Sequence, residues 1–221
     1  MSLHRRALIC YAFATLVLAA GMRLAAARYP GSFDWTYNVI SALASQKHNP
    51  GGAAWFAGAI VIAMACLWPV VTVVAAGIPR WVVVALRTGV ICGVLVGAER
   101  LVFPHFSSVI RKGHELLALV AFLSFYAGIT GLYAHRVRLR RASPWTAVMV
   151  LLPLLGAGVR EGWLYFAQRQ LGWADYDWKG TGAPLWLSFA LWQWLAAAML
   201  WLAMGQLLAT SGRAAAGAGA R

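Results

Sequence analysis

The chain has 221 residues, of which 62% are hydrophobic and only 11% are charged. Because soluble domains carry about 25% charged residues, this composition excludes an ordinary water-soluble fold. The formal net charge of +13 would suit a nucleic-acid-binding protein, but the basic residues form short clusters between apolar segments instead of one continuous polar surface. We therefore expect no nucleic-acid partner, and we interpret the clusters as basic loops of a membrane protein that contact anionic lipid head groups.

Six apolar segments are each long enough for a helix to cross the hydrocarbon core of a bilayer, which takes about 20 residues. In chain order they cover approximately residues 7–27, 53–76, 81–103, 114–134, 144–164 and 184–209. We predict an all-α integral membrane protein in which residues 1–210 form a single bundle of six transmembrane helices. The alanine- and glycine-rich segment 211–221 is predicted to be a disordered tail.

A polar segment over residues 29–51 separates the first two apolar segments, and turn-forming Pro-Gly and Asn-Pro-Gly-Gly sequences lie near its two ends. Within it, polar side chains recur at intervals of three or four residues, as on one face of a helix. They are Asp34, Asn38, Ser41, Ser45 and His48. We predict an amphipathic helix at the membrane interface, whose polar face either meets water or lines a cavity beneath the loop.

Arginine is concentrated on one side of the predicted bundle. With six spans, both termini lie on the same side as the turn at 78–80 and the loop at 135–141, and these segments contain no acidic residue. Their arginines are Arg5, Arg6, Arg80, Arg136, Arg138, Arg140, Arg141, Arg213 and Arg221. Because dense basic residues in short loops mark the cytoplasmic side, we predict that both termini are cytoplasmic.

The acidic residues and most histidines fall on the opposite side, the predicted outer face. The acidic residues are Asp34, Glu99, Glu115, Glu161, Asp175 and Asp177, and the histidines are His48, His105 and His114. Ionisable side chains at membrane depth are costly, and by default they indicate a functional site. The outer face is therefore where we expect binding or acid–base chemistry.

Two pairs of adjacent, opposite charges lie near that face. Glu99-Arg100 follows the glycine-rich part of the third span, and the reversed pair Arg160-Glu161 lies in the fifth span. Crossed pairing of Glu99 with Arg160 and of Arg100 with Glu161 would neutralise all of these charges. Such a network would be either a purely structural set of salt bridges or part of a substrate site, and the sequence leaves both interpretations open.

Residue types and spacing give candidates for chemistry but no catalytic motif. No spacing typical of zinc sites, such as HxxxH or HExxH, occurs in the chain, so we predict no metal and no cofactor. The candidate catalytic residues, which would act as a general acid or base if a reaction takes place, are His114, Glu161 and Glu99. The candidate substrate-binding residues are Asp34, Asn38, Ser41, His48, Arg100 and Arg160.

Two stretches, YNVISALASQKHNPGGAAWFAGAI and FPHFSSVIRKGHELLALVAF, resemble a family of six-helix prokaryotic membrane proteins, domain of unknown function 998. In the second stretch the matching residues are Phe103, Pro104, His114, Ala118 and Phe122. The family often has acidic residues after Phe-Pro, whereas this chain has His-Phe. The first stretch is also similar to the membrane family that contains autophagy modulators and a GPI-lipid remodelling factor. The resemblances imply a multi-pass protein of the bacterial cytoplasmic (inner) membrane that handles lipids.

Three functions follow from these observations. The first is binding or remodelling of a lipid or other amphiphile at the outer face, with Arg100 and Arg160 binding a phosphate or carboxylate head group through bidentate hydrogen bonds. The second is a small accessory subunit that packs against other subunits of a larger membrane complex through glycines such as Gly93. The third is a small transporter, against which stand the short chain and the lack of inverted repeats.

Overall fold

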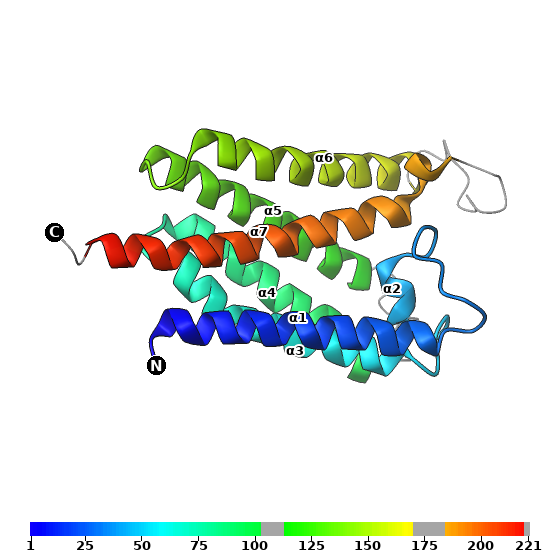
Figure 1. The fold of residues 1–221 in the computed structure, drawn as a ribbon. Helices are drawn as coiled ribbons and strands as arrows, with labels where there is room; N and C mark the ends of the chain where they lie inside the picture. The colour runs from blue at the N-terminus through cyan, green and yellow to red at the C-terminus, as the bar shows by residue number, and fades with distance from the viewer. Residues whose placement is uncertain (103–112, 170–183, 219–221) are drawn as a thin grey trace.

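The computed structural model describes residues 1–102, 113–169 and 184–218, together with the side chains of most of these residues. The described chain is all-helical (Figure 1). Its elements are α1 (Leu3–Ala27), α2 (Ile40–Leu43), α3 (Ala53–Val74), α4 (Arg80–Val102), α5 (Gly113–Arg138), α6 (Pro144–Arg169), the short 3₁₀ helix η2 (Leu185–Leu187) and α7 (Phe189–Ala218).

Six of the described helices, all except α2 and η2, are long and apolar enough to cross a membrane. The prediction of an all-α protein with six spans is therefore confirmed, and the chain is a multi-pass membrane protein by the length and composition of its helices. The last span begins at Phe189 because Pro184 is extended and residues 185–187 form the 3₁₀ turn. Helix α7 continues to Ala218. The disorder expected for residues 211–221 stays a prediction.

The two chain ends lie at one end of the bundle, and α2 lies at the other (Figure 1). We call the second the α2 end; it corresponds to the predicted outer face. Helices α1, α3, α4 and α5 pack in that order, and α6 packs mainly against α7, which also touches α1, α3 and α5. The orientation of the two ends relative to a membrane stays a prediction.

A core of large aliphatic side chains joins the helices on the side of the chain ends. Its buried members include Leu67, Val70, Val74, Leu86, Ile129, Leu132, Leu154, Met204 and Leu208. Because lipid tails are as apolar as these residues, the association of the helices depends on close packing and on interhelical hydrogen bonds. One such bond runs from the Tyr11 hydroxyl of α1 to the carbonyl oxygen of Trp201 in α7, at 2.7 Å.

The glycines of α4 provide close packing within the chain. A Cβ atom at Gly97 would lie 2.8 Å from the carbonyl oxygen of Ala57 in α3, and one at Gly93 would lie 2.8 Å from Cγ of Met64. Small residues at these positions let the two helices approach closely. Gly93 and Gly97 therefore pack against α3, and a Cβ atom at Gly89 would lie 3.0 Å from the Phe125 ring of α5. These glycines are occupied by packing within the chain, and the role of an accessory subunit stays a prediction.

Arg136 behaves differently from the other arginines near the chain ends, because α7 buries it. Its guanidinium donates hydrogen bonds to the Leu207 carbonyl oxygen at 3.1 Å and to the hydroxyls of Thr210 at 2.7 Å and Ser211 at 2.5 Å. A buried guanidinium needs such acceptors. Arg136 therefore joins α5 to α7 instead of facing a lipid head group.

The segment between α1 and α3 is not the continuous helix that the spacing of its polar residues predicts. Only Ile40–Leu43 is α-helical, and turns, bends and irregular backbone take up the rest. The physical reason lies in tertiary hydrogen bonds to the start of α7. The Gln193 side chain accepts from the Ile40 amide at 2.9 Å, Trp194 Nε1 donates to the Asn38 carbonyl oxygen at 3.0 Å, and the Ser188 hydroxyl donates to the Thr36 carbonyl oxygen.

Asn49 fastens the same segment to the end of α1. Its side chain is fully buried, and its amide nitrogen donates to the carbonyl oxygens of Ala25 and Leu43, both at 3.0 Å. A Cβ atom at Gly52 would lie 2.5 Å from that nitrogen, so only glycine fits beside it. The Asn-Pro-Gly-Gly sequence is therefore a packing element as well as a turn.

Candidate functional site

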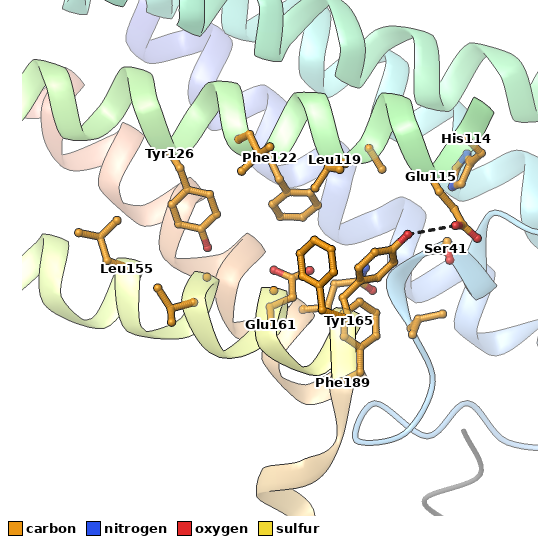
Figure 2. A pocket seen from close by; sticks show the side chains of 18 of the residues that line it. Ser41, His114, Glu115, Leu119, Phe122, Tyr126, Leu155, Glu161, Tyr165 and Phe189 are labelled. Atoms are coloured by element: carbon orange, nitrogen blue, oxygen red, sulfur yellow. Dashed lines mark hydrogen bonds between the residues drawn. The ribbon is translucent and has the colours of Figure 1, made fainter. Parts of the chain in front are cut away.

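A cavity of about 450 Å³ lies between α5 and α6 and reaches α2, α4 and α7 at the α2 end. This volume is within the range of small-molecule sites. Its polar lining residues are Ser41, Glu99, Arg100, His114, Glu115, Tyr126, Glu161, Tyr165 and Gln193. The remaining walls are formed largely by aliphatic and aromatic side chains (Figure 2).

At the α2 end of the cavity, the last turns of α4 meet the first turn of α5. His114 Nδ1 lies 2.8 Å from Glu99 Oε2 and 3.2 Å from Arg100 Nε, and Arg100 Nε lies 3.7 Å from the same glutamate oxygen. One imidazole nitrogen either donates or accepts a hydrogen bond. The tautomer of His114 therefore decides whether the ring holds the carboxylate or the guanidinium.

Two further carboxylates come from the facing walls. Glu115, in the first turn of α5, accepts a hydrogen bond from the Tyr165 hydroxyl of α6 at 3.4 Å (Figure 2). Glu161 lies on α6 and points toward α5 between Tyr126 and Tyr165 (Figure 2). Glu99 forms ion pairs with Arg100 and His114, whereas Glu161 forms no ion pair within residues 1–102, 113–169 and 184–218.

The α5 wall follows from the periodicity of the helix. Glu115, Leu119, Phe122 and Tyr126 are separated by four, three and four residues, so they lie on one face of α5. All four line the cavity. The wall therefore carries a carboxylate at one end, apolar groups along its length and a phenol at the other end.

The α6 wall is shaped by glycine. A Cβ atom at Gly158 would lie 2.5 Å from Cζ of Tyr126, so the phenol ring rests directly on the α6 backbone. A Cβ atom at Gly162, one turn nearer the α2 end, would have no atom within 4 Å. Gly162 therefore leaves open space inside the cavity.

The cavity opens sideways, between α5 and α6. Leu123 on α5 and Val159 on α6 line it, yet these side chains are 58% and 73% exposed. Both lie within helices that are long and apolar enough to cross a membrane, and an exposed side chain of such a helix meets lipid in a bilayer. An amphiphile that moves within the bilayer can therefore reach the cavity without passing through water.

The structure brings together part of the predicted site. Of the candidate residues, those that line the cavity are Ser41, Glu99, Arg100, His114 and Glu161. Three residues of the resemblance to the six-helix family, His114, Ala118 and Phe122, also line it. Helix α5 places them there because they are spaced by four residues.

The other candidates lie outside the cavity lining. Asp34 Oδ1 accepts a hydrogen bond from the Thr36 amide at 3.0 Å. The backbone carbonyl oxygen of Asn38 accepts a hydrogen bond from Trp194 Nε1. His48 is exposed. Arg160 donates to the Trp186 carbonyl oxygen at 3.2 Å, so in the described part of the chain the predicted crossed pairs of the Glu99, Arg100, Arg160 and Glu161 side chains do not form. His105, Asp175 and Asp177 lie outside the described residues.

Sequence reasoning missed several residues of the cavity. Glu115, Tyr126, Tyr165 and Gln193 were not among the predicted site residues, although each lines it. The spacing of Glu115, Leu119, Phe122 and Tyr126 was a readable signal for the α5 wall. Tyr165 and Gln193 carried no such signal, because they reach the cavity from other helices.

The described residues contain no group of three or more His, Cys, Asp or Glu side chains placed to hold a metal ion. Comparisons of the chain with protein-family models, curated proteins and solved structures found no match. The resemblance to the six-helix prokaryotic family therefore stays a prediction. The case for a function rests on the cavity.

Proposed function

We propose that this chain is a protein of the bacterial cytoplasmic membrane, with both termini in the cytoplasm, that binds an amphiphile from the surrounding lipid in the cavity between α5 and α6. The observation that carries the proposal is the division of the cavity into a polar end and apolar walls with a lateral opening. A polar head group would lie among the charged side chains of the lining, which are Glu99, Arg100, His114, Glu115 and Glu161. An apolar chain would lie against residues such as Leu123.

The length of the cavity suits this arrangement. Glu115 and Tyr126 both line it, and their separation of 11 positions in the sequence corresponds to about 16 Å along a helix at 1.5 Å per residue. The hydrocarbon core of a bilayer is about 30 Å thick, so the cavity spans about half of it. A lipid of one leaflet can then lie beside α5 with its head group at the α2 end.

The proposal concerns binding, and no bond-breaking step is assigned. His114, Glu99 and Glu161 all lie at the cavity. Each of these side chains can exchange a proton with a bound molecule. A further role in lipid remodelling would begin from these groups.

Filling the cavity should prevent binding. We expect Gly162→Leu to place an isobutyl group in the open space, because a Cβ atom at Gly162 meets nothing within 4 Å. Binding of an amphiphile should fall roughly fivefold or more, since overpacking a filled site costs about 1–3 kcal/mol. The measurement is photolabelling in lipid nanodiscs with hexadecyl probes that carry a diazirine in the chain, followed by mass spectrometry of the labelled peptides.

Gly156→Leu is the matched control. Gly156 is on the same helix, a Cβ atom there also meets nothing within 4 Å, and the residue does not line the cavity. We expect its labelling to equal that of the wild type. Equal labelling of α5 and α6 in wild-type and Gly162→Leu protein would contradict the proposed function.

A further inference from the structure

The described residues that line the cavity carry more acidic than basic groups. The carboxylates are those of Glu99, Glu115 and Glu161, whereas the basic groups are the Arg100 guanidinium and the His114 imidazole. Glu99 contacts both basic groups, at 3.7 Å and 2.8 Å respectively. The basic groups at the rim are thus already engaged by a carboxylate of the protein.

Glu161 is the carboxylate that most needs a partner. It lies on α6 within the segment Pro144–Ala167, which is long and apolar enough to cross a membrane. It forms no ion pair with any described residue. An ionised carboxylate within such a segment is costly unless an opposite charge accompanies it.

The surroundings of Glu161 also suit a cation. Phe122, Tyr126 and Tyr165 line the same cavity as Glu161, and Figure 2 shows the Glu161 carboxylate pointing into the space that these residues border. The faces of aromatic rings attract ammonium groups, and more strongly where water is excluded. The Tyr126 hydroxyl is buried and has no hydrogen-bond partner among the described residues, so its oxygen can accept a hydrogen bond from an ammonium group.

We infer that the ligand of this cavity is a cationic amphiphile, an apolar chain that bears a protonated amine paired with the Glu161 carboxylate. This inference rests on the proposed function, because it names the head group of the same ligand. It replaces the expectation of a phosphate or carboxylate held by Arg100 and Arg160. Arg100 is engaged by Glu99, and Arg160 donates to the Trp186 carbonyl oxygen outside the cavity lining.

The first arm of the test compares head groups. Wild-type protein in lipid nanodiscs is photolabelled with diazirine-bearing hexadecylamine, hexadecanol and hexadecyl phosphate, which share one chain. We expect the amine to label the walls of α5 and α6 about tenfold more than the other two, because of the three probes only the amine brings a positive charge to the Glu161 carboxylate. A tenfold difference corresponds to about 1.4 kcal/mol. Equal or stronger labelling by the phosphate would overturn the inference while leaving the proposed function intact.

The second arm removes the charge and keeps the shape. Glu161→Gln should lower labelling by the amine about tenfold and leave labelling by hexadecanol unchanged. Asp34→Asn is the matched control, since Asp34 lies at the same end of the bundle but does not line the cavity. Asp34→Asn should change neither the labelling by hexadecylamine nor the labelling by hexadecanol. Labelling by the amine that is insensitive to Glu161→Gln would overturn the inference.

The two proposals fail in different ways. If none of the three probes labels α5 or α6 above the level seen in Gly162→Leu, the proposed function itself is wrong. If the amine does label the cavity and this labelling depends on Glu161, a diacyl phosphoethanolamine probe identifies the source of the amine. Labelling by it that depends on Glu161 indicates a phospholipid head group, and labelling restricted to hexadecylamine indicates a free long-chain amine.

Discussion

Gly97→Ala should destabilise the folded protein, whereas Gly58→Ala should leave its stability unchanged or slightly raised. The added Cβ atom at Gly97 would lie 2.8 Å from the Ala57 carbonyl oxygen and 2.9 Å from a methyl carbon of Val61. The first of these is backbone, which cannot rotate away, so α4 must move from α3. Overpacking of this kind costs about 1–3 kcal/mol of the free energy of unfolding.

Gly58→Ala is the matched control, because Gly58 lies next to Ala57 within the same contact region of α3. A Cβ atom there meets nothing within 4 Å, so the substitution adds the same methyl group without a clash. Alanine favours a helix over glycine by up to about 1 kcal/mol. Thermal unfolding in detergent micelles measures both variants. Equal midpoints for the two would contradict the close packing of α3 and α4.

The Gly97 variant should also weaken binding at the cavity. Glu99 and Arg100 follow Gly97 within one turn of α4 and contact His114 at the cavity rim. A shift of α4 moves both side chains. Photolabelling with hexadecylamine should fall in Gly97→Ala and stay at the wild-type level in Gly58→Ala.

Asn49→Ala should produce a loss of stability of about 3 kcal/mol. The substitution leaves the Leu43 carbonyl oxygen without the donor that it now has at 3.0 Å, whereas the Ala25 carbonyl oxygen keeps the Arg28 amide as a donor at 3.2 Å. An unsatisfied buried group costs about 1–3 kcal/mol. The substitution also leaves a void, because the Asn49 side chain is fully buried. The midpoint of thermal unfolding and the rate of proteolysis between α1 and α3 both measure this effect.

Asn38→Ala is the control for this prediction. Asn38 lies in the same segment and is bound to Trp194 through its backbone carbonyl oxygen, which the substitution keeps. We expect a change in the free energy of unfolding within about 0.5 kcal/mol, as for most surface substitutions. Similar losses in both variants would show that the segment tolerates no alanine, and that the bonds of Asn49 are not the cause.

The six spans could be predicted because their signal is local. A helix that crosses a bilayer needs a continuous apolar run, and each run is visible without knowledge of its neighbours. The gathering of Glu99, His114 and Glu161 at one end also followed, because alternating spans place their ends on alternating sides. Neither conclusion required the rotation of any helix about its axis.

Predictions that depended on tertiary contacts were less successful. The spacing of Asp34, Asn38 and Ser41 indicated one helix, but hydrogen bonds from Gln193 and Trp194 hold that segment in turns. The crossed pairing of charges failed for a related reason. Neighbouring residues on a helix point about 100° apart, and here Glu161 lines the cavity while Arg160 donates to the Trp186 carbonyl oxygen outside the lining.

Because the cavity opens sideways between α5 and α6, the affinity of a ligand is measured against its solubility in the bilayer. Bulk lipid, not water, is the competitor that a ligand must displace, and burying an apolar chain brings little gain when the chain leaves an equally apolar phase. Selectivity then depends on the head group. Occupancy should follow the mole fraction of ligand in the bilayer, so adding ligand-free vesicles should empty the cavity even at constant total ligand.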